Sequence, residues 1–166
     1  MQTRFLIITG MSGAGKTQVV RTLEDLKYFC IDNLPAALIP KFAELCRQTS
    51  ESNVALVVDV RGGQFFDKLL QVLDEITASG QKYELLFLDA DDATLVRRYK
   101  ETRRRHPLGD SDTLLDNLAQ ERQLLEPLLE KASYIINTSE LNATELKNRI
   151  KELFSTDNER ERMGIV

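Results

Sequence analysis

The feature that most constrains the fold is a glycine-rich segment between an apolar stretch and a helical pattern. The residues before the segment, Phe5 to Thr9, are apolar or β-branched, and those after it, Gln18 to Leu26, have a helical period. This order predicts a buried strand, a tight loop and a helix, which together begin an α/β fold. The segment matches the pattern G-x-x-x-x-G-K-[ST] and reads Gly10-Met11-Ser12-Gly13-Ala14-Gly15-Lys16-Thr17.

This segment has the composition of a phosphate-binding loop. Glycines allow backbone conformations in which successive N–H groups point at phosphate oxygens, and the following helix adds its positive N-terminal end. We expect Lys16 to reach the β- and γ-phosphates of a nucleotide and Thr17 to ligate Mg²⁺ through its hydroxyl group. The sequence therefore predicts a site for a nucleoside triphosphate and magnesium.

Four more apolar stretches are each followed by a helical pattern. The third of the five stretches begins Val54-Ala55-Leu56-Val57-Val58, and such continuous apolar character is typical of parallel strands that are buried on both faces. We expect a three-layer α/β sandwich of the P-loop NTPase class with a mostly parallel five-stranded sheet over residues 1–156, resembling small nucleotide or metabolite kinases. The four stretches are Tyr28 to Ile31, Val54 to Val60, Tyr83 to Leu88 and Tyr134 to Ile136.

Composition excludes several other classes of protein. A chain of 166 residues with 42% hydrophobic residues and a net charge of -4 can form one domain with a core, unlike a disordered chain. No apolar run approaches the roughly 20 residues that cross a bilayer, so no membrane segment is expected. Only two cysteines, Cys30 and Cys46, are present, and the N-terminus reads as a strand rather than a signal peptide, which favours a cytoplasmic location.

Acidic residues at strand ends are the candidate partners of the metal. Asp59 follows the apolar run that ends at Val58, where a carboxylate can reach Mg²⁺, and its alternative role is that of a helix cap or turn residue. Asp89 ends the fourth strand and is either linked to the metal or part of the cap of the next helix. Asp32 and Asn33 follow the second strand, where they either contact a second substrate or form a turn.

A basic stretch lies between the fourth strand and a leucine-rich helix. We expect Arg97 to Asp112 to form an exposed flap and Arg104 to stabilise charge on the transferred phosphoryl group, with Lys16 and Asp59 as the other catalytic candidates. A solvated helical face and a contact for RNA or protein remain as alternatives. Further along the chain, Pro127 predicts a kink or a helix boundary near Glu126. Six of the 22 Lys and Arg residues lie in the stretch: Arg97, Arg98, Lys100, Arg103, Arg104 and Arg105.

Four segments in this order resemble the RapZ/YvcJ family of bacterial nucleotide-binding proteins. They are Gly10 to Thr17, Leu23 to Pro35, Asp59 to Gly62 and Thr102 to Leu108, and the last reads T-R-R-R-H-P-L. The resemblance implies a P-loop domain that binds ATP and GTP and hydrolyses both slowly. It also implies that the first segment binds ATP and that Asp59-Val60-Arg61-Gly62 binds GTP.

The resemblance has further implications for partners and for domain organisation. The RapZ branch is an RNase adaptor that binds small regulatory RNAs, largely through a C-terminal domain. The resemblance implies that residues 157–166 are a linker toward such a domain, which this chain lacks, so that an RNA or protein partner is expected only of the full-length protein. Lys27 stands where the family usually has glycine.

Three functions remain open from the sequence. The chain is a weak magnesium-dependent NTPase, a small-molecule kinase that uses the basic flap over the phosphates, or a non-catalytic switch whose partner affinity depends on nucleotide. The sequence contains no N-K-x-D string, which guanine-specific GTPases usually carry, and we expect tolerance of both ATP and GTP.

Overall fold

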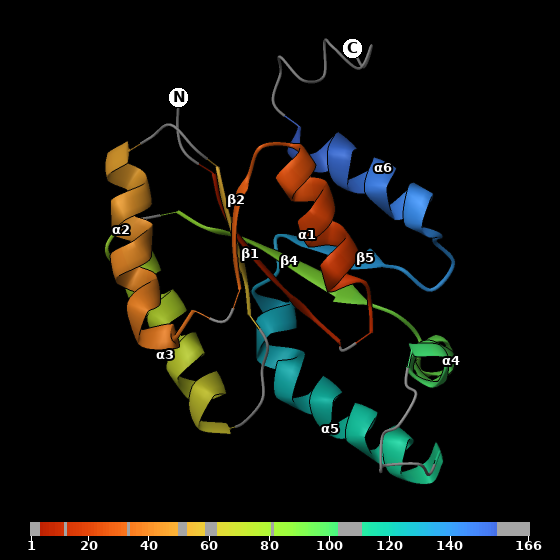
Figure 1. The fold of residues 1–166 in the computed structure, drawn as a ribbon. Coiled ribbons are helices and arrows are strands. Elements are labelled where there is room, and N and C mark those ends of the chain that lie inside the picture. Colours follow the sequence, from red (N-terminus) through yellow and green to blue (C-terminus); the bar gives the residue numbers. More distant parts are fainter. Residues whose placement is uncertain are drawn as a thin grey trace.

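The strands form one parallel sheet. In a computed structural model, which describes residues 4–11, 13–32, 34–49, 53–58, 63–80, 82–102 and 111–155, the sheet has five strands in the order β2-β3-β1-β4-β5 (Figure 1). Every neighbouring pair is parallel, as the apolar stretches predict. The strands are β1 (Phe5–Gly10), β2 (Phe29–Asp32), β3 (Val54–Val57), β4 (Glu84–Asp89) and β5 (Tyr134–Asn137).

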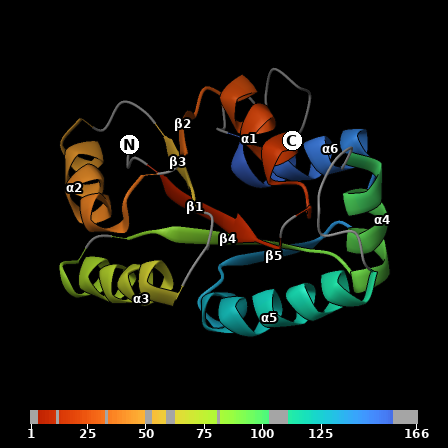
Figure 2. The same cartoon turned by 60° about the horizontal axis from the view of Figure 1, so that its bottom comes forward.

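Helices cover both faces of this sheet and complete three layers. Helices α1 and α6 lie on one face, and α3 and α5 lie on the other (Figure 2). This arrangement confirms the predicted α/β sandwich. The helices are α1 (Lys16–Asp25), the short 3₁₀ helix η1 (Ala36–Leu38), α2 (Ile39–Thr49), α3 (Gly63–Ala78), α4 (Asp92–Thr102), α5 (Ser111–Glu130) and α6 (Ala143–Phe154).

Burial follows the position of each strand in the sheet. The central strand β1 is buried at every residue, and β3 is buried along its whole length. The edge strands are less covered, since Phe29 in β2 and Ile135 in β5 are 57% and 58% exposed. The apolar runs of β1 and β3 therefore reflect helices on both faces, whereas the edge strands are protected mainly on one face.

All strands have their carboxyl ends at one edge of the sheet, where ligands bind in folds of this kind. The chain places β1 between β3 and β4, so three strand ends meet beside the glycine-rich loop. The N–H of Val58 donates to Ile8 O at 2.9 Å, which extends the pairing with β1 one residue beyond β3. Asp59 and Val60, the end of the expected strand, lie outside the described residues.

The expected flap from Arg97 to Asp112 is wrong at both of its ends. Arg97 to Thr102 belong to α4, and residues 111 and 112 belong to α5. The carboxylate Oδ1 of Asp91 accepts a hydrogen bond from the N–H of Thr94 at 2.7 Å and caps α4. The helix then continues through residues with good helix propensity, which include several of the basic ones.

Pro127 does not end its helix, so the helix boundary expected near Glu126 is absent. Helix α5 runs through Pro127 to Glu130. Leu125 and Leu128, on either side of the proline, are 2% and 0% exposed, so core packing holds the last turn where the proline removes a hydrogen bond. In the part of the chain that the structure describes, no helix combines the length and apolar character needed to cross a membrane.

Candidate functional site

The glycine-rich loop connects β1 to α1 in a backbone conformation that favours glycine. Gly10, Gly13 and Gly15 have φ angles of 146°, 86° and 114°. A Cβ atom on Gly10 would lie 2.1 Å from Leu88 O and 2.7 Å from Leu88 N, so no other residue fits without a shift of β4. The N–H of Met11 also donates to Leu88 O at 3.0 Å. The loop is therefore held tightly against the end of β4.

Helix α1 begins without the side-chain cap that its neighbour α6 has. In α6, the side chain of Asn142 accepts from the N–H of Glu145 at 2.8 Å, and the side chain of Glu145 accepts from the N–H of Asn142 at 3.0 Å. The cap residue of α1 is Gly15, which has no side chain, and the first turn contains no acidic residue. The positive end of α1 is thus suited to an anion, which neither its cap residue nor its first turn supplies.

Lys16 and Thr17 stand at the start of α1, as the sequence predicts. The Lys16 side chain is half-buried, and its Nζ donates to Gly10 O at 3.2 Å, which places the ammonium group at the loop. Thr17 is exposed in the first turn. The structure therefore gathers backbone N–H groups, one ammonium group and one hydroxyl group, which is a donor set that suits phosphate oxygens and a phosphate-bound cation.

Two residues that sequence reasoning did not assign to the loop hold its backbone. Arg98 of α4 donates to Gly13 O at 3.2 Å and to Thr138 O and Oγ1 at 2.6 and 2.9 Å. The Thr138 hydroxyl donates to Ala14 O at 2.7 Å. Composition alone places Arg98 in the flap. The position of Thr138 directly after β5 was a usable signal, because the carboxyl ends of parallel strands meet at one edge.

Asp89 is engaged in an ion pair at the end of β4. Its Oδ1 accepts from Arg122 Nη1 and from the N–H of Ala90, both at 2.8 Å. Arg122 also pairs with Asp92 at 2.8 Å, and although burial acts to lower the pKa of the Arg122 guanidinium, these carboxylates raise it. The cap of α4 is Asp91 rather than Asp89. The described residues include no group of three or more His, Cys, Asp or Glu that suits a metal ion.

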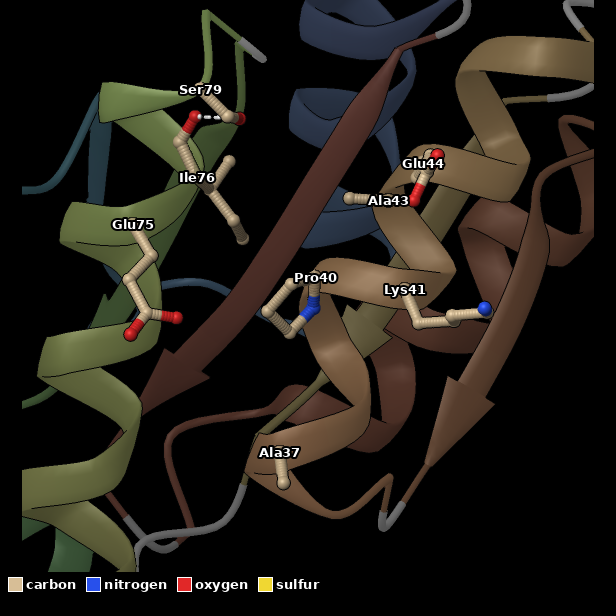
Figure 3. A pocket seen from close by; sticks show the side chains of 8 residues that line it. All are labelled: Ala37, Pro40, Lys41, Ala43, Glu44, Glu75, Ile76 and Ser79. Carbon is tan, nitrogen blue, oxygen red and sulfur yellow. Dashed lines mark hydrogen bonds between the residues drawn. The ribbon is translucent and has the colours of Figure 1, made fainter.

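Two surface hollows differ in their relation to the loop. One lies between α2 and α3 and includes no loop residue (Figure 3). The other, of about 260 Å³, lies beside the loop, where Met11 and Phe87 meet the side of α5 that carries Arg122 and Gln123. Only the second hollow is placed to hold a molecule next to a bound phosphate. The residues around the first are Ala37, Pro40, Lys41, Ala43, Glu44, Glu75, Ile76 and Ser79.

The remaining candidates are either distant from the loop or undescribed. Asp32 is exposed at the carboxyl end of β2, two strand positions from β1 and so about 10 Å from it across the sheet. Cys30 is a free, half-buried thiol, and burial raises its pKa to about 11. The candidates outside the described residues are Ser12, Asn33, Asp59, Val60, Arg61, Gly62, Arg103, Arg104 and Arg105.

Comparison with known proteins gives a family and a fold. Residues 3–158 match the family described as RapZ-like N-terminal domain. A protein of Clostridium botulinum named nucleotide-binding protein is 50% identical over 165 residues, which are 98% of this chain and 56% of that protein. The chain thus spans about half the length of the curated relatives that it matches.

Solved structures of other proteins share the fold. Shikimate kinase from Bacteroides thetaiotaomicron has a TM-score of 0.61 at 21% identity, over 99% of this chain and 100% of that one. A tunicamycin resistance protein from Deinococcus radiodurans has a TM-score of 0.65 at 15% identity, over 93% and 98%. Identities this low support a common fold and nothing about substrates.

Proposed function

The chain belongs to the RapZ-like N-terminal domain family, and from this premise we propose that it binds ATP and GTP at Gly10 to Thr17 and hydrolyses both slowly with Mg²⁺. The observation that carries the proposal is the loop itself. Three glycines with positive φ, the uncapped start of α1 and the ammonium group of Lys16 meet at the end of the central strand. The names of the Clostridium relatives also support nucleotide binding.

The residues present fit a magnesium nucleotide. The close approach of Gly10 to Leu88 holds the loop backbone against the end of β4, and Thr17 presents a hydroxyl group in the first turn of α1. Bound Mg²⁺ would neutralise charge on the β- and γ-phosphates. We assign its protein ligands to Thr17 and Asp59, because Asp59 directly follows Val58, which is hydrogen-bonded to β1.

The proposed hydrolysis depends on positioning and charge rather than on a strong base. Lys16 and the loop N–H groups would hold the phosphates, and Arg104 would stabilise charge that develops on the transferred group. Asp89, at the end of the neighbouring strand, is hydrogen-bonded to Arg122 and is poorly placed to accept a proton from water. Slow turnover is consistent with this arrangement. Asp59 to Gly62 are proposed as a segment used in GTP binding.

We assign a regulatory role to this activity, as a nucleotide-dependent switch or an RNase-adaptor module in the cytoplasm. The family supports this role, and the free thiol of Cys30 suits a reducing compartment. Residues 1–156 would form the nucleotide-binding domain and 157–166 a linker toward a C-terminal domain, which supplies contacts with RNA or protein in the full-length protein. The relatives, which are nearly twice as long as this chain, support that division.

Titration with Mg-ATP and Mg-GTP, together with phosphate release, tests the proposed function. Lys16→Ala removes a charged donor to the phosphates and should weaken the affinity for both nucleotides at least about tenfold and abolish release. Lys68→Ala removes an exposed lysine from α3 and serves as the control with unchanged affinity. Unchanged affinity and phosphate release in the Lys16 variant would show that the proposal is wrong.

A small-molecule kinase is the second candidate, and the hollow beside Met11 favours it. An acceptor in this hollow would lie next to the phosphate loop, with Gln123 and Glu126 of α5 available for hydrogen bonds. For an acceptor in this hollow, Asp59 is the carboxylate proposed to approach its hydroxyl group, because Asp32 lies on β2, three strand positions from β4. A screen of hydroxylated metabolites for faster ADP formation tests this function, and the absence of any stimulation would remove its support.

A further inference from the structure

Thr138 is a junction of four segments of the chain. Its N–H donates to Asp89 O at 2.8 Å at the end of β4, and its carbonyl oxygen accepts from Arg98 of α4 and from the N–H of Leu141. Its hydroxyl group donates to Ala14 O in the phosphate loop and accepts from Arg98. Thr138 as a whole is 1% exposed. Every polar atom of Thr138 is thus used to join the loop to the surrounding elements.

The two loop carbonyl groups held in this way fix two peptide planes. Arg98 holds Gly13 O, and Thr138 holds Ala14 O. A peptide unit is planar and, in the described residues, trans, so its N–H points away from its carbonyl oxygen. Fixing the oxygen of Ala14 therefore directs the N–H of Gly15 to the side opposite Thr138. The N–H of Ala14 is fixed too, and it donates to Met11 O at 3.1 Å.

This constraint matters because glycines surround these planes. Gly13 and Gly15 lack the side chains that restrict φ and ψ, so an unrestrained loop would sample many conformations in which its N–H groups do not converge. Ordering such a loop on binding lowers affinity, and a loop that is already ordered avoids that loss. The two residues that supply the order lie outside the loop sequence, in α4 and after β5.

We propose that Arg98 and Thr138 are positioning residues that hold the phosphate loop in the conformation that binds a polyphosphate. This role rests on the proposed nucleotide site and adds two residues to it that touch the loop backbone rather than the reacting groups. The pair acts as one unit, because Arg98 donates to the same threonine that holds Ala14 O. Their effects on affinity should therefore not be additive.

Titration of the intact chain with Mg-ATP and with inorganic triphosphate tests the proposal. Thr138→Val keeps the shape but removes the hydroxyl group, which leaves the buried Ala14 O without its donor, and should weaken both ligands about tenfold. Thr138→Ser keeps the hydroxyl group and should restore most of the affinity. Arg98→Ala should also weaken binding, whereas Arg97→Ala, an exposed residue on the same helix, should not.

The design separates positioning from general stability and from the proposed function itself. Thermal unfolding of each variant without ligand shows whether it is folded at the titration temperature. The double variant of T138V and R98A would support a shared role if its fold-loss of affinity is much smaller than the product of the fold-losses of the two single variants. If Lys16→Ala abolishes binding but folded T138V and R98A variants bind both ligands like wild type, the positioning role alone is overturned. If the wild-type protein binds neither ligand, the proposed function itself is wrong.

Discussion

The strands begin at one edge of the sheet, the amino edge, and end at the opposite one, the carboxyl edge. These two edges are held together in opposite ways. At the amino edge, side chains bind one another: Arg4 donates to Glu84 at 2.5 and 3.0 Å and to Tyr134 at 3.0 Å, and its guanidinium lies 4.9 Å from the ring centre of Phe154. At the carboxyl edge, Arg98 and Thr138 bind loop carbonyl groups. The amino edge satisfies its own charges, whereas the carboxyl edge uses side chains to prepare backbone N–H groups for a ligand.

This difference shows how one small domain can be stable and still offer a binding site. The Arg4 cluster joins the beginnings of β1, β4 and β5 to the end of α6, since Arg4 also donates to Leu153 O at 3.2 Å. The loop lies at the other end of β1, about 20 Å away along a six-residue strand. Substitutions in the Arg4 cluster should therefore lower stability with little effect on binding.

The largest effect is expected from Gly10→Ala at the carboxyl edge. The added Cβ would overlap Leu88 O and would also sit at a positive φ, so the free energy of unfolding should fall by about 4 kcal/mol. Urea unfolding measures this loss of stability. If the variant is insoluble, its refolding yield is measured instead.

Gly80→Ala is the matched control for that substitution. Gly80 also has a positive φ, of 88°, but nothing lies within 4 Å of an added Cβ, so only backbone strain of about 1 kcal/mol is expected. Equal losses in the two variants would show that the contact with β4 does not constrain the loop.

Arg4→Ala should separate stability from binding at the amino edge. It leaves the half-buried Glu84 carboxylate without its cation and should lower the free energy of unfolding by about 2 kcal/mol, a value reduced for partial exposure. Affinity for Mg-ATP should stay within about twofold of wild type once the protein is folded. Arg149→Ala on the exposed side of α6 is the control with little change in stability. A large loss of affinity in R4A would show that the two edges are coupled.

A smaller, pH-dependent effect is expected at the same cluster. Burial acts to raise the pKa of Glu84, but hydrogen bonds from Arg4 and Tyr134 outweigh it and hold the pKa below the ordinary value. Because the folded state favours the charged form, this stabilisation is present above the pKa of the unfolded chain and is lost as the pH falls through the folded pKa. Urea unfolding of wild type and Glu84→Gln should give stabilities that converge below about pH 4. A constant difference from pH 7 to pH 3 would contradict this assignment.

The sequence predicted the order of the elements better than the contacts between them. Apolar stretches identified all five strands, and those of β1 and β3 are continuous because parallel strands buried on both faces leave little room for polar residues. The basic run after β4 predicted an exposed flap because its composition is mostly charged. This prediction is wrong for Arg98, which is half-buried and bound to the loop. The predicted helix boundary near Glu126 is wrong, because local propensity does not include the packing of Leu125 and Leu128 against the core.

By itself, the sequence determined the α/β class, the place of the phosphate loop and the residues Lys16 and Thr17 at the start of α1, because these depend on local order and on the conformational freedom of glycine. The tertiary structure alone decided that Asp89 pairs with Arg122, and that residues 98 and 138 meet at the loop. Those contacts join residues between 33 and 124 positions apart, and only the order of strands in the sheet brings them together.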